Sequence, residues 1–150
     1  MKIIVDANIV FSGILNSSGN IGRLLIHSKG ILEFYSSEYL LVEIESHFPK
    51  LLKLTDLGSD ELSELIATVT RDITFLSDSF LSKSALKSAY DIVKDIDADD
   101  LLFVAMANSV PDAKLWTGEK KLHGGLLKKG VSNVMTAADL LTYLNKRSAE

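Results

Sequence analysis

Residues 1–10 read MKIIVDANIV, a short apolar run followed by an acid. Residues 2–5 form a short apolar run rich in β-branched side chains, which is typical of a buried central strand in a parallel sheet. Asp6 follows where the run stops, and Asn8 lies two residues further on. Open α/β sheets build their sites at the carboxyl ends of such strands, although Asp is also a common first residue of a turn. Asp6 is therefore a candidate functional acid if other acids occupy equivalent places.

Extended and helical patterns alternate along the rest of the chain. Short apolar runs predict further strands at 32–35, 73–76, 114–116 and 131–135. Apolar periodicity and capping residues predict helices at about 21–28, from 37, from 49, from 59, at 82–93, at 101–107 and from 136 to about 145. Residues 12–20 have the composition of a loop, and Gly124 and Gly125 are expected to break the basic segment 120–130 into a short helix or turn. This alternation predicts the α/β class, a three-layer α/β/α fold around a mostly parallel sheet.

The composition is that of one globular domain. The chain has 150 residues, of which 47% are hydrophobic and 24% charged, so we expect a single domain over residues 1–145 and a frayed tail at 146–150. The absence of cysteine excludes disulfides, thiolate metal sites and a cysteine nucleophile, and it fits a cytoplasmic protein. No apolar run approaches the roughly 20 residues of a membrane helix, and we expect no signal peptide.

The net charge of −4 argues against a protein that coats nucleic acid through bulk positive charge. It leaves open an enzyme that holds a phosphodiester through a metal ion, because the ion brings its own positive charge. The lysines at 120, 121, 128 and 129 form a basic patch that either steers RNA or is simply solvated. His27, His47 and His123 have no mutual ligand spacing and receive no chemical role, and Trp116 is expected in the core.

A second acidic segment, DIDADDLLFVAMA, spans residues 95–107. Its apolar half predicts a helix that is buried on all sides. Asp97 and Asp100 have the spacing of an N-cap and its N3 acid, which favours Asp97 as a helix cap. Asp95 and Asp99 are expected to be solvated. Asp100, next to a long apolar run, is a stronger candidate for a functional acid.

Acids follow or flank several of the predicted strands. Asp6 ends the first strand, Glu43 lies on the helix after the second, and Glu119 follows a later strand closely. With Asp100, these groups meet at one edge of a doubly wound sheet. Carboxylates gathered in one cleft either raise their pKa values or hold a cation. Because only oxygen ligands are present, the expected ion is Mg²⁺ or Mn²⁺, which can activate water and neutralise charge on a phosphoryl group.

Four segments resemble the PIN-domain nucleases, small metal-dependent ribonucleases that often act as toxins of toxin–antitoxin pairs. The segments are VDANIVFSGIL (5–15), YLLVEI (39–44), DADDLLFVAMA (97–107) and LWTGEKKL (115–122). They occur in the family's order, and the resemblance extends from Lys2 to about Leu141. It implies metal ligands at Asp6, Glu43, Asp100 and Glu119. It also implies that Asn8 and Thr117 position acids or water, and it makes Asp97 a further candidate ligand. Glu119 stands where the family usually has Asp, which bears on binding of a second metal ion.

The resemblance implies a metal-dependent endoribonuclease that hydrolyses RNA phosphodiester bonds as a toxin, with an antitoxin partner and a homodimeric state. Two alternatives remain open: a PIN nuclease of RNA processing without an antitoxin, and an inactive PIN module that binds RNA or protein. A phosphatase or receiver domain fits less well, because no second acid lies beside Asp6 in the arrangement those proteins use.

Overall fold

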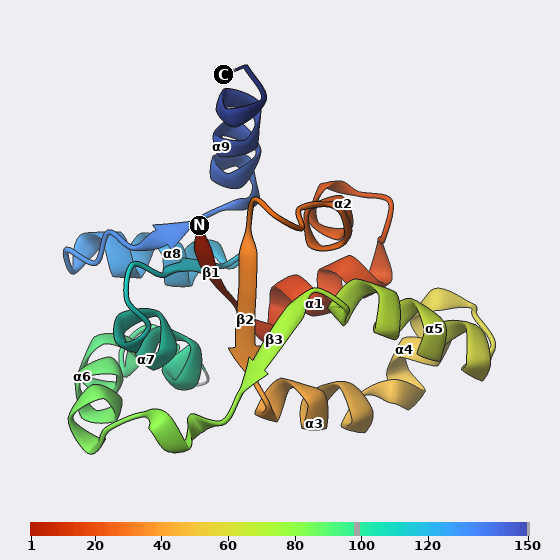
Figure 1. Ribbon diagram of the computed structural model, residues 1–150. Coiled ribbons are helices and arrows are strands. Elements are labelled where there is room, and N and C mark those ends of the chain that lie inside the picture. Colours follow the sequence, from red (N-terminus) through yellow and green to blue (C-terminus); the bar gives the residue numbers. More distant parts are fainter. Residues whose placement is uncertain (98–99, 150) are drawn as a thin grey trace.

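The computed structural model describes residues 1–97 and 100–149, and its centre is a parallel sheet (Figure 1). Within those residues the sheet has five strands in the order β3-β2-β1-β4-β5, all parallel. The strands are β1 (Lys2–Val5), β2 (Glu33–Ser37), β3 (Ile73–Leu76), β4 (Lys114–Trp116) and β5 (Val134–Met135). The predicted three-layer α/β/α fold is confirmed.

Helices cover both faces of this sheet (Figure 1). One face carries α1 (Ala7–Leu15), α2 (Asn20–His27), α3 (Tyr39–Ser46), α4 (Phe48–Thr55), α5 (Ser59–Thr70) and α9 (Ala137–Ala149). The other carries α6 (Lys83–Val93), α7 (Leu101–Ser109) and α8 (Lys120–Lys128). A 3₁₀ turn, η1 (Asp78–Phe80), leads from β3 into α6. None of the helices in the described part of the chain is long and apolar enough to cross a bilayer.

Strand β1 is the structural centre, as its sequence predicts. It lies between β2 and β4, and Ile3, Ile4 and Val5 are completely buried. Because successive side chains of a strand point to opposite faces, Ile3 and Val5 enter the core under α1 and α2, whereas Ile4 enters the core under α6 and α7. One four-residue strand therefore joins both hydrophobic cores.

Helix α1 corrects the prediction of a loop at residues 12–20. The helix starts immediately after β1, because the Asp6 carboxylate caps it by accepting a hydrogen bond from the Ile9 N–H at 3.0 Å. Its buried face has a helical spacing that includes Gly13, where a Cβ would lie 2.8 Å from Leu25 Cδ1. The glycine that suggested a loop instead allows α1 and α2 to approach closely.

Helix α8 is also continuous where two glycines were expected to break it. A Cβ at Gly125 would lie 2.6 Å from Ile96 Cδ1, so the missing side chain lets the helix pack against the segment before α7. Leu122 and Leu126 are buried beneath it. Their burial outweighs the roughly 1 kcal/mol by which each glycine disfavours a helix.

Smaller differences concern the ends and faces of helices. The predicted capping box of α9 is confirmed, since the Thr136 N–H donates to Asp139 Oδ2 at 2.9 Å and the Asp139 N–H donates to Thr136 Oγ1 at 3.2 Å. Helix α9 continues to Ala149, beyond the predicted end near Asn145; fraying of residues 146–150 stays a prediction. Leu41, expected on the apolar face of its helix, is 45% exposed.

Gly22 provides a test of the packing around α2. A Cβ at this position would lie 2.3 Å from the backbone oxygen of Ser17, which cannot rotate away. We expect Gly22→Ala to lower the free energy of unfolding by about 1–3 kcal/mol in urea denaturation. The matched control is Gly124→Ala, another helical glycine, whose Cβ would meet nothing within 4 Å and which should gain up to about 1 kcal/mol. Equal stability of the two variants would contradict the close approach.

Candidate active site

Asp6 is fixed at the carboxyl end of the central strand. It is 1% exposed, and its Oδ1 is held by the Ile9 N–H of α1. Its Oδ2 is buried and has no hydrogen-bond partner among the described residues. Because strand β1 and helix α1 meet at this residue, the carboxylate has little freedom to move. One oxygen therefore caps a helix, and the other remains available to a ligand.

Asp100 is held in a similar way by helix α7. It occupies the N-cap position, is 6% exposed, and its Oδ2 also lacks a partner within the described structure. The helix behind it is buried on all sides, as predicted, with residues 103–107 in the core. A helix packed so tightly holds the acid at its first turn in place. The sequence favoured Asp97 as the cap of this helix; the structure instead has Asp100 there.

Asp97 and Glu119 complete a cluster around Asp100. Each of the three residues offers a carboxylate oxygen, and these oxygens lie within 4.8 Å of one another. Glu119 reaches the cluster from the turn after β4, where its N–H donates to Thr117 Oγ1 at 3.1 Å. Asp97 thus belongs with the candidate ligands. Asp99 lies outside the described residues, and Asp95 is exposed and pairs with Lys129.

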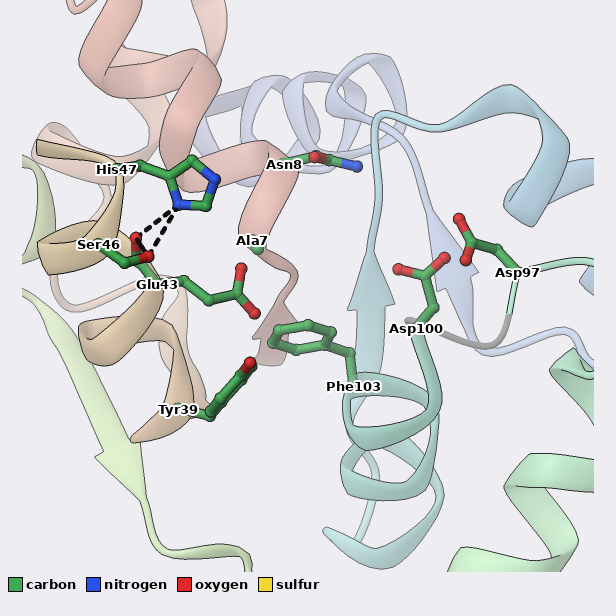
Figure 2. A pocket seen from close by; sticks show the side chains of 9 residues that line it. All are labelled: Ala7, Asn8, Tyr39, Glu43, Ser46, His47, Asp97, Asp100 and Phe103. Carbon is green, nitrogen blue, oxygen red and sulfur yellow. Dashed lines mark hydrogen bonds between the residues drawn. The ribbon is translucent and has the colours of Figure 1, made fainter. Parts of the chain in front are cut away.

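Glu43 faces this cluster across a cleft of about 540 Å³. Figure 2 shows Glu43 and Asp100 projecting from α3 and α7 on opposite walls, with Asp97 beside Asp100. Asn8, in the first turn of α1, lines the same cleft. The acids that the sequence singled out are therefore gathered at one edge of the sheet. The roles expected of them as ligands, and of Asn8 and Thr117 as positioning residues, stay predictions.

The environment opposes ionisation of the two buried acids. Burial raises the pKa of Asp6 to about 6, the nearby Thr117 hydroxyl and the hydrogen bond from the Ile9 N–H oppose this rise, and the charge of Glu119 adds to it. Burial raises the pKa of Asp100 to about 8, with further contributions from the charges of Glu119, Asp6 and Asp97. Carboxylates that repel one another in this way are stabilised by a cation placed between them.

The residues present fit a divalent cation. Two buried carboxylate oxygens, on Asp6 and Asp100, have no protein partner in the described part of the chain, and such atoms are costly unless something pairs with them. The donors are oxygens throughout, which suits hard ions with oxygen coordination. Glu119 and Asp97 each have a carboxylate oxygen close enough to Asp100 to share a bound ion with it.

Comparison with known protein families agrees with a site for a divalent cation. A family model described as PIN domain matches residues 4–141. The chain belongs to the PIN-domain family. No curated protein matches it significantly. The family is of nuclease type, its nucleases act on RNA, and its members typically use divalent metal ions, in agreement with the acidic cluster of this PIN domain.

His47 is the residue at the site that the sequence analysis missed. It lies just past the end of α3 and lines the cleft with Glu43 (Figure 2). The three histidines have no ligand spacing to one another, so their mutual positions give no signal. The informative spacing was instead to the acid, because His47 follows Glu43 by four residues and therefore lies on the same side of the helix.

The metal-free PIN domain should lose stability as the pH rises from about 4 to 8. The unfolded carboxyls ionise near 3.8, whereas folded Asp6 and Asp100 keep their protons up to about 6 and 8. The folded state therefore binds more protons within this window, and the free energy of unfolding falls with increasing pH. We expect Asp6→Asn to be more stable than the wild type at pH 8, by about 3 kcal/mol, and similar to it below pH 4.

Urea denaturation in EDTA at several pH values measures this difference. The matched control is Asp91→Asn, which changes an exposed acid on α6 away from the cleft and should follow the wild-type pH dependence. An Asp6→Asn profile parallel to that of the wild type would show that burial of this carboxylate carries no such cost.

Proposed function

We propose that this PIN domain is a divalent-metal-dependent endoribonuclease that hydrolyses phosphodiester bonds of RNA. The observation that carries the proposal is the pair of buried carboxylates, Asp6 and Asp100, each with an oxygen that no described residue satisfies. A protein gains no stability from such an arrangement, since burying unpaired charge is costly. The arrangement is instead suited to binding a cation, and family membership makes nuclease chemistry its use.

The proposed ligands of the cation are Asp6, Glu43, Asp97, Asp100 and Glu119. We propose Mg²⁺ or Mn²⁺ as the ion, since both prefer carboxylate oxygens. A bound ion of this kind supplies positive charge that offsets the charge developing on a phosphoryl group, and it lowers the pKa of water. Glu119 replaces the usual Asp, and its position within 4.8 Å of Asp97 and Asp100 supports its membership of the ligand set.

The chain's own residues would hold the substrate and the ligands in place. The cap of α1 holds Asp6 in one orientation, and the Thr117 hydroxyl fixes the turn that carries Glu119. Asn8 is exposed in the wall of the cleft, where its amide could hydrogen-bond a phosphate oxygen or water. Rigid support of this sort lowers the cost of reaching the reactive geometry.

The biological role that we propose is that of a toxin, acting on RNA in the cytoplasm and shut off by an antitoxin protein. This proposal, like that of a homodimer, rests on the family resemblance. The alternative role, a nuclease of RNA processing without an antitoxin, would use the same site and the same chemistry.

Purified protein should cleave a mixed RNA pool with Mg²⁺ or Mn²⁺ and leave it intact in EDTA. Asp6→Asn should lower the cleavage rate by roughly 100-fold or more, because losing a direct metal ligand costs at least as much as losing a residue that supports one. Gel analysis of the products measures the rate, and Asp91→Asn is the control that should retain activity.

Calorimetric titration with Mn²⁺ distinguishes a metal-dependent nuclease from an inactive binding module. We expect binding by the wild type and weaker binding by Asp100→Asn. Metal binding without cleavage would favour a nuclease restricted to one target. A folded protein that neither binds Mn²⁺ nor cleaves RNA would overturn the enzyme proposal and favour an inactive binding module.

Induced expression in a bacterial host tests the toxin role. We expect growth to stop within a few generations on expression of the wild type, and to continue at the same expression level of Asp6→Asn. Growth arrest by both proteins would mean that the arrest does not come from the nuclease site. Normal growth with an active wild-type enzyme would favour RNA processing.

A further inference from the structure

Two aromatic residues flank Glu43, a proposed metal ligand on α3. Tyr39 begins the helix, and His47 follows its last residue. Tyr39, Glu43 and His47 are spaced by four residues each, so they form one row along the helix, with a rise of about 6 Å between neighbours. All three line the cleft that also contains Asp100 (Figure 2). The two rings therefore flank Glu43 along this wall of the cleft.

Tyr39 is presented to solvent at one end of this row. It is 53% exposed, although a large aromatic ring usually gains by burial. Isolated exposed aromatic residues are common, and Tyr90 on α6 is exposed to the same degree, at 50%. What distinguishes Tyr39 is its position, because its ring forms part of the cleft wall whereas Tyr90 lies outside the cleft lining.

His47 is held rigidly at the other end. Its Nδ1 lies 2.8 Å from the Glu43 carbonyl oxygen and 3.2 Å from Ser46 Oγ, and its ring packs against Phe11 with centroids 5.4 Å apart. Because a carbonyl oxygen only accepts hydrogen bonds, Nδ1 carries the proton there. Figure 2 shows the ring directed into the cleft. A side chain fixed in this way loses little entropy when it binds a ligand.

The described lining of the cleft offers no positively charged side chain to bind RNA. Its lining in the described structure includes three acids and no lysine or arginine, so the walls themselves repel a phosphate backbone. Lys50 lies in an adjoining groove, beyond His47. Unpaired RNA bases bind to proteins chiefly by stacking on aromatic rings, an attraction that needs no charge.

We propose that Tyr39 and His47 each stack on a nucleobase, one on either side of the phosphodiester presented to the acidic cluster. This inference rests on the proposed ribonuclease function and adds the residues that position its substrate. The two rings would hold unpaired nucleotides in register with the metal ligands. A base-paired strand could not use them, since its bases are already stacked within a helix.

Binding measurements with the Asp6→Asn protein test this proposal without cleavage. The probe is a fluorescently labelled single-stranded RNA of mixed sequence in Mn²⁺, and its binding is measured by fluorescence anisotropy. A second set of RNAs has the same sequence, but each member lacks the base at one position. We expect Tyr39→Ala and His47→Ala each to raise the Kd roughly 5- to 100-fold, as for loss of a stacked base. Tyr39→Phe and His47→Phe, which keep a ring, should retain most of the affinity.

Removing the base should have the same effect as removing the ring. For the RNA copy that lacks the stacked base, Tyr39→Ala should cause no further loss, because the partner is already missing. Tyr90→Ala and His27→Ala are the matched controls, since they remove an equally exposed tyrosine on α6 and an exposed histidine on α2, and they should leave the Kd unchanged.

Four results would overturn the proposal. Unchanged Kd values for both alanine variants, in a protein whose wild type cleaves RNA, would reject these contacts and leave the ribonuclease function intact. Losses that persist equally on every base-free RNA would show that the rings do not bind bases. A dimer that dissociates in Tyr39→Ala by sedimentation would assign this face to a second copy of the chain. Absence of both RNA binding and cleavage in the wild type would reject the proposed function as well.

Discussion

The hydrogen bond between the Asp6 carboxylate and the Ile9 N–H is the interaction on which the rest of the structure depends. It converts the end of the central strand directly into the start of α1. The same carboxylate is thereby buried, and its second oxygen has no partner among the described residues. A single residue thus ends the strand, starts the helix and contributes a buried carboxylate to the candidate site, so a substitution here affects the fold and the candidate site together.

Burial of carboxylates close to one another at the edge of the sheet lowers the stability of the protein. Burial, and to a lesser degree the neighbouring acids, raises the pKa of Asp6 to about 6 and that of Asp100 to about 8, so these two acids lower the stability of the metal-free protein at neutral pH. The tightly packed surroundings, with β1 and α7 almost wholly inside the cores, supply the stability that makes this tolerable. The two acids proposed as metal ligands therefore lower the stability of the fold, a trade-off that is common in catalytic sites.

The sequence allowed prediction of the parts of the structure that depend on local pattern. The buried strand before Asp6 and the apolar helix after Asp100 were both evident from runs of apolar residues. The extent of helices α1 and α8 was not evident, because their glycines suggest loops. Each glycine instead leaves room for a residue distant in sequence, Leu25 for Gly13 and Ile96 for Gly125. The sequence could not show whether Asp97 caps a helix or belongs to the acidic cluster, because its spacing to Asp100 fits both roles. Its proximity to Glu119, a residue distant in sequence, is what distinguishes the two roles.

The order of strands in the sheet has a consequence for synthesis on the ribosome. Ile3 pairs with Phe34 on one side but with Lys114 on the other, so the central strand waits for its second neighbour until most of the chain has been made. The same delay separates Asp6 from Glu119. Contacts between such distant residues form late and slowly. A nascent chain therefore carries an incomplete set of acids, and a protein that attacks RNA would stay harmless to the message and ribosome that are producing it.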